Sequence, residues 1–189
     1  ASYNSKLILG PIDDVNMSQS SNDVIPTAIK ISAHIDLTKK LYPALDKLIN
    51  EIQKKAKSLK GVTKTGRTHL MDAMPIDFSD ELLAWSSQLS ACRNMLGVIE
   101  ERFLELPQGG TAVGSGINAH KQFAKFFAQE MSKILETKRK YIPSNNFFHE
   151  LSAQDCSVQL SGELKNLAVI LMKISNDLRW MNSGPLAGL

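Results

Sequence analysis

The residues best suited to chemistry lie in three segments that are rich in glycine and small polar side chains. One of them, residues 65–75, places His69 directly after Thr68 and just ahead of a long helical pattern. A histidine can move a proton or polarise a water molecule near neutral pH, provided that an acidic group holds its other ring nitrogen. Without such a partner a loop histidine is more often merely solvated, so His69 by itself leaves catalysis open. Arg67 and Asp72 in the same segment could contact a substrate, but we expect them to form an ion pair that braces the loop.

An earlier segment, residues 13–23, contains Ser20, Ser21 and Asn22. Their hydroxyl and amide groups, together with the free N–H groups at the start of the following helix, could hold a small carboxylate. The same residue types also cap helices without any ligand. This segment alone therefore fits both a binding site and a plain helix cap.

A third segment, residues 106–118, contains four glycines with hydroxyl and amide side chains between them. Glycine lets the backbone come close to a ligand or to another subunit. The segment is no Walker loop, because no Gly-Lys-Ser/Thr follows, and no dinucleotide fingerprint, because no strand precedes it. The sequence therefore does not support a nucleotide cofactor.

Long helices are predicted to position these segments. Apolar residues return every three or four positions in residues 23–60, from near Pro75 to residue 106, and in residues 150–182, which is the helical period. We expect Pro43 to bend or interrupt the first of these helices, and we expect a shorter helix over residues 119–136. No pair of strands is predicted anywhere in the chain.

The predicted fold class is all-α, a long-helix bundle that forms one domain over residues 1–189. A helix of about 33 residues spans about 50 Å, more than a compact domain of this size would cover. Apolar seams on helices that long usually need partners, so we expect a homo-oligomer whose subunits share a bundle. A monomeric bundle or a coiled-coil scaffold is the alternative.

The composition argues against several classes of function. A net charge of +3, from 22 basic and 19 acidic residues spread along the chain, gives no nucleic-acid face. No apolar run is long enough to cross a membrane, and the polar start, residues 1–6, is unlike a secretory signal. Cys92 and Cys156 lack metal-ligand spacing and are expected to be buried free thiols. We therefore expect a cytoplasmic protein, or a mitochondrial one whose presequence has been removed.

The three segments together resemble the fumarase/aspartase superfamily. The matching motifs, in the order and spacing of that family, are Ser-Gln-Ser-Ser-Asn-Asp at residues 18–23, Gly-Arg-Thr-His-Leu-Met-Asp-Ala at 66–73 and Gly-Gly-Thr-Ala-Val-Gly at 109–114. The resemblance covers essentially the whole chain and extends to residues 171–180 and 183–189. It is closest to class II fumarases, because aspartases tend to carry glutamine at the position of His69 and Gly-Ala-Thr in the glycine loop.

The resemblance implies the central helical domain of a fumarate hydratase, which reversibly adds water to fumarate to give L-malate. It implies a homotetramer in which each active site draws residues from three subunits, and it implies no metal or organic cofactor. Ser20, Ser21 and Asn22 would bind a substrate carboxylate, and another subunit would contribute Thr68 and His69. His69 would be the catalytic residue that positions or activates water, oriented by a glutamate outside this sequence.

Two parts of the family pattern are absent from the chain. The mobile Gly-Ser-Ser loop, with the serine thought to act as the base, should follow Leu189, and an N-terminal domain should precede Ala1. We therefore expect the chain to be a segment of a longer enzyme. It should fold and oligomerise but have no hydratase activity alone.

A second, non-catalytic dicarboxylate site is associated in many fumarases with a His-Pro-Asn-Asp run. The corresponding residues here are Gly10, Pro11, Ile12 and Asp13. Because Gly10 and Ile12 replace the histidine and the asparagine, we expect this site to bind dicarboxylate weakly or not at all.

Two other functions remain open from the sequence. An ammonia-lyase acting on aspartate, or another lyase of the superfamily, would use the same scaffold with a different loop beyond Leu189. A non-catalytic helical oligomerisation scaffold is the alternative outside the enzymes. The loops argue against a scaffold, which has no reason to keep Ser20, Ser21, Asn22, Thr68 and His69 together.

Overall fold

The computed structural model describes residues 9–184. The chain divides into two compact units: unit 1 comprises Ala1–His34 and Glu101–Cys156, and unit 2 comprises Ile35–Glu100 and Ser157–Leu189. Residues 1–6 of the polar start, and residues 185–189 at the end of the family-like run, lie outside the described residues. The protein is mainly helical, as predicted.

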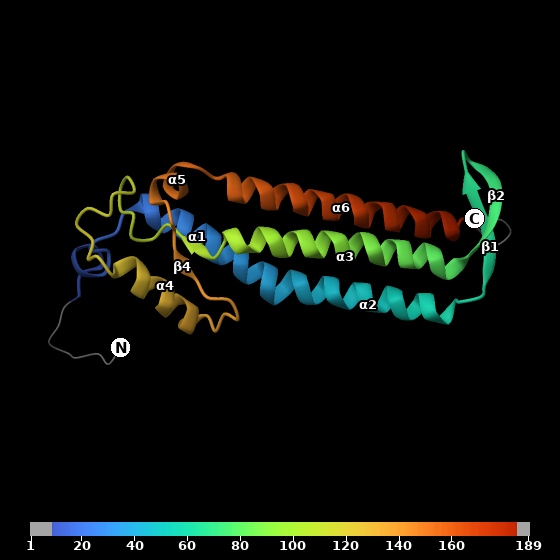
Figure 1. The fold of residues 1–189 in the computed structure, drawn as a ribbon, viewed down its shortest axis with the longest axis horizontal. Coiled ribbons are helices and arrows are strands. Elements are labelled where there is room, and N and C mark those ends of the chain that lie inside the picture. The colour runs from blue at the N-terminus through green and yellow to red at the C-terminus, as the bar shows by residue number, and fades with distance from the viewer. Residues whose placement is uncertain (1–8, 185–189) are drawn as a thin grey trace. The chain divides into compact units, whose positions relative to one another are not determined.

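Unit 2 is built on three long helices, α2 (Tyr42–Ser58), α3 (Phe78–Arg102) and most of α6 (Asp155–Met181). Figure 1 shows the three lying side by side. The Tyr42 hydroxyl donates to the carbonyl of Leu96 at 3.1 Å, which joins α2 to α3. The Trp85 indole donates to Asp177 at 3.1 Å, which joins α3 to α6.

The predicted apolar seam of α3 is the centre of this packing. Its buried members are Leu82, Trp85, Leu89, Cys92 and Leu96. On α6 the predicted seam is only partly buried, since Leu160 and Ile174 are covered while Leu178 is 52% exposed. Three- and four-residue spacing therefore identified the helices correctly but did not fix how far each seam is covered by its own chain.

The first predicted helix is interrupted just before Pro43, as expected. Helix α1 (Ser21–Asp36) runs into a π-helical turn, η2 (Leu37–Leu41), and then into α2. Proline has no N–H to donate to the carbonyl one turn earlier. The wider π turn breaks the regular pattern at this point, and the Tyr42 N–H bonds to the carbonyl of Leu37.

The prediction that no strands pair is wrong. Strands β1 (Thr63–Thr68) and β2 (Met71–Asp77) form an antiparallel hairpin, so α3 begins at Phe78 and not near Pro75. The hairpin escaped prediction because β1 has no apolar residue, β2 contains Pro75 and lacks a polar–apolar alternation, and the turn is not of the Asn-Gly type. A second, two-residue parallel ladder joins β3 (Glu105–Leu106) to β4 (Ile142–Pro143).

Unit 1 holds most of α1, a short π-helix η1 (Pro11–Val15), α4 (Phe123–Ile134) and α5 (Phe147–Ser152). The predicted helix over residues 119–136 is α4, and it begins later than expected. The predicted helix over residues 150–182 is divided into α5 and α6, because Ala153 between them is extended, with φ −129° and ψ 148°.

Both cysteines are buried free thiols, as predicted. Burial raises the pKa of Cys92 to about 12, and burial also raises the pKa of Cys156. Thiols held in the protonated form are poor nucleophiles and poor metal ligands. Within residues 9–184 no cluster of His, Cys, Asp and Glu could hold a metal ion, and no helix is both long and apolar enough to cross a membrane.

Candidate active site

The start of α1 forms a reciprocal cap. The Ser20 hydroxyl accepts the N–H of Asn22 at 3.2 Å, and the Ser20 N–H donates to Oδ1 of Asp23 at 2.9 Å. Such a box satisfies donors that a helix start leaves without partners. Ser20 is half-buried, whereas Ser21 and Asn22 are exposed at the helix start, where an anion is stabilised.

Side chains of the first predicted segment bind the backbone of the third. The amide Nδ2 of Asn22 donates to the carbonyl of Ala112 at 2.8 Å. The hydroxyl of Ser18 donates to the carbonyl of Asn118, also at 2.8 Å. Two of the three predicted segments therefore lie together in unit 1, and the helix-capping role is confirmed for Ser20.

Asp23 also links the same two segments, from a buried position. Its side chain is fully buried, and Oδ2 accepts the N–H groups of Gly109 at 3.0 Å and Thr111 at 2.9 Å. Sequence reasoning did not single out this residue. The signal was present in the spacing of Ser20 and Asp23, which places a carboxylate at the third helical position of a capping box.

The glycines of the third segment are required by packing within unit 1. Gly109 has φ +104°, and a Cβ there would lie 2.7 Å from the Cβ of Ala124. Gly114 has φ +102°, and a Cβ there would lie 2.8 Å from the backbone nitrogen of Phe148. The close approach that glycine permits is therefore made to α4 and α5 of the same chain.

The hairpin of unit 2 carries Thr68 and His69 at its tip. Thr68 pairs with Met71 across a two-residue turn, in which His69 has φ 51° and Leu70 has φ 61°. Two positive φ values are what the tightest hairpin turns need, and Asn-Gly usually supplies them. A leucine held there costs about 1–2 kcal/mol. Backbone strain of this kind concentrates at functional sites.

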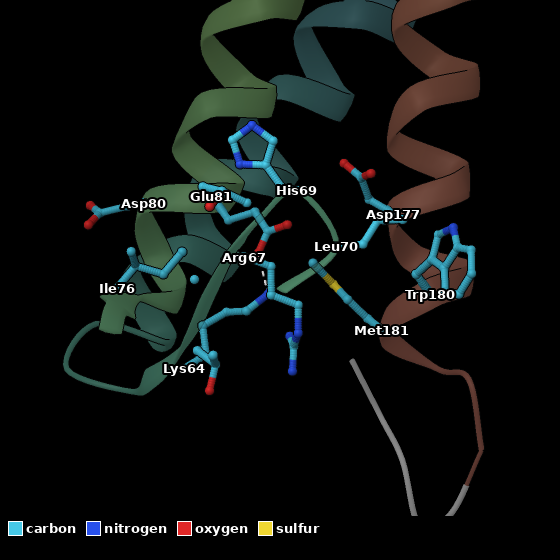
Figure 2. Close-up of a pocket in the computed structure, with 13 residues that line it drawn as sticks. Lys64, Arg67, His69, Leu70, Ile76, Asp80, Glu81, Asp177, Trp180 and Met181 are labelled. Atoms are coloured by element: carbon cyan, nitrogen blue, oxygen red, sulfur yellow. Dashed lines mark hydrogen bonds and ion pairs between the residues drawn. The ribbon is translucent and has the colours of Figure 1, made fainter. Parts of the chain in front are cut away.

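A hollow of about 920 Å³ adjoins the hairpin tip. Figure 2 shows it between the hairpin and the ends of α3 and α6, with His69 and Arg67 on one side and Asp177 and Trp180 on another. Arg67 pairs with Asp72 at 3.4 Å, so the predicted loop-bracing ion pair is confirmed.

His69 itself is exposed, and within residues 9–184 no hydrogen bond or ion pair engages its ring. A catalytic histidine needs a group that fixes its tautomer and ring orientation. The described part of the chain does not provide that group. The remaining histidines differ: His34 is buried and bonds through Nδ1 to the Tyr141 hydroxyl at 2.7 Å, while His120 lies in the loop before α4, outside the helix predicted for it.

The predicted site residues are thus divided between the units. Ser20, Ser21 and Asn22 belong to unit 1, and Thr68 and His69 belong to unit 2. The start of α1 and the hairpin tip are therefore separate structural elements of the candidate site.

The segment compared with the second dicarboxylate site lies at η1. Asp13 is exposed in this π-helical turn, and Gly10 precedes it as the N-cap. The N–H of Gly10 donates to Oδ2 of Asp14 at 2.7 Å. The Gly10 N–H is therefore already bonded to a carboxylate of the chain.

Lys30 is a buried cation of unit 1 with three bonding partners. It is 5% exposed, pairs with Glu150, and donates to the carbonyls of Arg102 at 3.0 Å and Glu105 at 2.9 Å. A buried charge is stable only when it is paired and hydrogen-bonded in this way. These contacts tie α1 to β3 and α5 within unit 1.

Comparison with known proteins points to the same family as the motifs. The sequence profile of the lyase family matches residues 4–189. The chain is 49% identical over 181 residues to a class II fumarate hydratase of Pseudomonas aeruginosa, covering 96% of this chain and 39% of the relative. It is 51% identical over 179 residues to a class II fumarate hydratase of Xylella fastidiosa, covering 95% and 37%. The crystal structure of class II fumarase from Schistosoma mansoni superposes with a TM-score of 0.89 at 34% identity, covering 99% and 42%. The chain thus spans about two fifths of the length of these relatives.

Proposed function

This chain belongs to the lyase family, and from that premise we propose that the whole protein is a class II fumarate hydratase. It would interconvert fumarate and L-malate without a metal or an organic cofactor. The chain would be the central domain of that enzyme and inactive by itself. The chain matches about two fifths of the length of its relatives, which supports its being one part of a longer enzyme.

In this proposal the start of α1 binds one substrate carboxylate. Ser20, Ser21 and Asn22 supply hydroxyl and amide donors beside the positive end of the helix. In the direction from malate, a base removes the proton from the carbon next to a carboxylate, and the electron pair moves into that carboxylate. Donors fixed before the reaction stabilise such charge, while the donors at the start of α1 hold their carboxylate in the ground state and the transition state alike.

His69 would act on the water molecule. In hydration the water oxygen bonds to one alkene carbon and a proton is added to the other; in dehydration the hydroxyl leaves with a proton as water. An imidazole can position that water and carry its proton. Thr68 would contribute a further substrate contact beside it, and a carboxylate from outside this chain would orient the ring.

The observation that carries the proposal is the placing of His69. The chain holds it at φ 51°, beside a strained Leu70, on the wall of a hollow that Thr68 also lines. A helical scaffold without activity would gain nothing from that arrangement.

The test is the ultraviolet absorbance of fumarate over time, with the whole protein given fumarate, L-malate and L-aspartate in turn. Loss of absorbance from fumarate and its appearance from malate alone are expected. Appearance from aspartate would identify an ammonia-lyase instead. An unchanged absorbance with all three substrates would favour another lyase or a scaffold.

We further propose a homotetramer whose active sites are shared between subunits. Apolar residues on α6 that are more than half exposed within the described residues support it; they are Val158, Val169, Met172 and Trp180, exposed by 51% to 68%. Gly162, in the same helix, would bring a Cβ into open space. Sedimentation analysis of the purified chain tests this: a tetramer is expected, and a monomer at micromolar concentration would contradict it.

Two smaller proposals follow. The η1 segment around Asp13 binds dicarboxylate weakly or not at all, since Asp14 already uses the Gly10 N–H; a malate-induced chemical-shift change centred on Asp13 would overturn this.

The enzyme works in the cytoplasm, or in mitochondria if a presequence was removed. Fractionation of cells, with detection of the protein by an antibody, would test this localisation.

A further inference from the structure

Asp23 is a buried carboxylate that no cation neutralises within residues 9–184. It has no exposed surface. Its charge is met by three backbone N–H groups, those of Ser20, Gly109 and Thr111, at 2.9 to 3.0 Å. Burying a charge is costly unless hydrogen bonds replace its water. These three bonds therefore hold the carboxylate, and the carboxylate in turn holds the three peptide groups.

The three donors come from two segments far apart in the sequence. Oδ1 takes the N–H of Ser20, directly before α1, while Oδ2 takes two N–H groups of the glycine loop 86 and 88 residues later. Hydrogen bonds to an ionised acceptor are about twice as strong as neutral ones. Asp23 is thus a charge-assisted bridge between the helix start and the glycine loop.

Thr111 shows that the loop conformation needs such a bridge. It has φ 59°, a region that a β-branched residue rarely enters, and its hydroxyl is buried without a hydrogen-bond partner within the described residues. Both features disfavour the conformation that Thr111 adopts. The hydrogen bond from the Thr111 N–H to Asp23 stabilises that conformation.

The residue after Thr111 makes the connection to the candidate site. The carbonyl of Ala112 accepts the side-chain amide of Asn22 at 2.8 Å, which fixes how that amide is turned. If Thr111 moved, Ala112 would move with it, and Asn22 would lose its orientation.

We propose that Asp23 is a positioning residue for dicarboxylate binding. It acts through Ser20, Thr111 and Ala112 to set the geometry of the donors at the start of α1, and it does not touch the substrate. This inference rests on the proposed function, which makes those donors the carboxylate site.

The decisive measurement is the split between KM and kcat in the whole enzyme carrying Asp23→Asn. The amide keeps the shape of the side chain but removes the charge and turns a donor toward backbone N–H groups. Displaced binding groups weaken ground state and transition state alike, so KM for L-malate should rise about tenfold while kcat changes by less than about threefold. A purely structural role would lower the folded fraction, and with it kcat, at unchanged KM.

Ser132→Ala is the matched control. The Ser132 hydroxyl is also buried in unit 1 and also accepts a backbone N–H from another segment, that of Tyr141 at 2.9 Å. The same hydroxyl donates to the carbonyl of Ala128 at 2.8 Å, so its bonds hold α4 and not the helix start or the glycine loop. This variant should melt earlier than wild type and keep the wild-type KM.

A double mutant tests the route of the effect. If Asp23 acts by orienting Asn22, then Asn22→Ala alone and Asn22→Ala with Asp23→Asn should have KM values within about threefold of each other, because the second change has little left to displace. Should Asp23→Asn fail to fold, Asp23→Glu keeps the charge and shifts it by one methylene, and the same KM rise is expected.

The possible results distinguish a failure of this inference from a failure of the proposed function. A wild-type enzyme silent with fumarate and malate would overturn the function and this inference with it. An active wild type with unchanged KM in a folded Asp23 variant would overturn only the positioning role. That role would also be overturned if neither Asp23 variant folds, because Asp23 would then serve the fold alone.

Discussion

The helix start of unit 1 and the hairpin tip of unit 2 carry the candidate site residues in opposite ways. At the helix start, Ser20 and Asn22 are tied into a network that ends on the buried Asp23. At the hairpin tip, His69 is exposed, and within the described residues nothing fixes its ring. The donors of the helix start are held by hydrogen bonds within their own chain, whereas the described part of the chain provides no partner for the His69 ring.

The two regions differ in what fixes the positions of their side chains. Groups that bind a carboxylate need several donors fixed at once, and a local network can fix them. A proton-carrying histidine needs a carboxylate on its second ring nitrogen. Under the proposed function, the hairpin tip gains that partner only on assembly with the rest of the enzyme.

The largest expected effect is at the hairpin tip. In the whole enzyme, His69→Asn should lower kcat by about 100-fold or more, the usual contribution of a positioned acid–base group. The melting temperature should change little, because the side chain is exposed in this chain and loses at most the one hydrogen bond to the carboxylate that orients it in the whole enzyme. Steady-state kinetics with L-malate give the measurement, and His120→Asn is the control. A kcat within about threefold of wild type would remove His69 from the chemistry.

Substitutions at the helix start should mainly weaken substrate binding. Asn22→Ala in the whole enzyme should raise KM for L-malate about tenfold, about 1.4 kcal/mol, with a smaller change in kcat. Asn50→Ala on the exposed face of α2 is the control and should leave KM unchanged. If Asn22→Ala lowered only kcat, the helix start would act on the transition state and not on substrate binding.

The strain of the hairpin turn gives a third, smaller effect. Leu70→Gly should stabilise the chain by about 1 kcal/mol, since glycine accepts φ 61° without a steric cost. For a domain of this size that is a rise of about 2–4 °C in Tm by calorimetry. Ala73→Gly, inside β2, should instead lower Tm. A lower Tm in Leu70→Gly would mean that the exposed leucine makes contacts in the assembled protein.

The smallest effect concerns the base of the hairpin. Asp77 has a pKa below its ordinary 3.8, because of the hydrogen bonds from the Ser79 side chain and from the N–H groups of Gly61 and Ser79. A carboxyl group whose pKa is lower in the folded state than in the unfolded state stabilises the fold at pH values above the unfolded-state pKa. That stability is lost as the pH falls through the folded-state pKa. The Tm of wild type should therefore fall below about pH 4, and that of Asp77→Asn should fall less. Parallel curves would show that Asp77 contributes nothing to acid stability.

Helix α3 and the hairpin show how far sequence prediction reached. The seam of α3 repeats every three or four residues and is buried as predicted, because a helix that packs on one side must follow that period. The hairpin has no comparable signal. β1 has no apolar residue, and β2 contains Pro75 and does not alternate polar with apolar residues, so neither pattern nor propensity marks the strands. The turn residues His69 and Leu70 are also atypical.

The candidate site divides in the same way. The capping role of Ser20 and the ion pair of Arg67 with Asp72 join residues close in sequence, and both were predicted. The bond between Asp23 and Thr111 spans 88 residues and was not predicted. No local rule reports which distant N–H groups a buried carboxylate will meet.

The sequence alone determined the helical class, the burial of the α3 seam, the free thiols and the family motifs, because period, spacing and residue type are local properties. Tertiary structure decided the rest: that the glycine loop closes on Asp23, that Asn22 is turned toward Ala112, and that His69 stands on a strained turn beside a hollow. These depend on groups that meet only after the chain has folded, where burial makes each unpaired polar atom costly and so selects one arrangement.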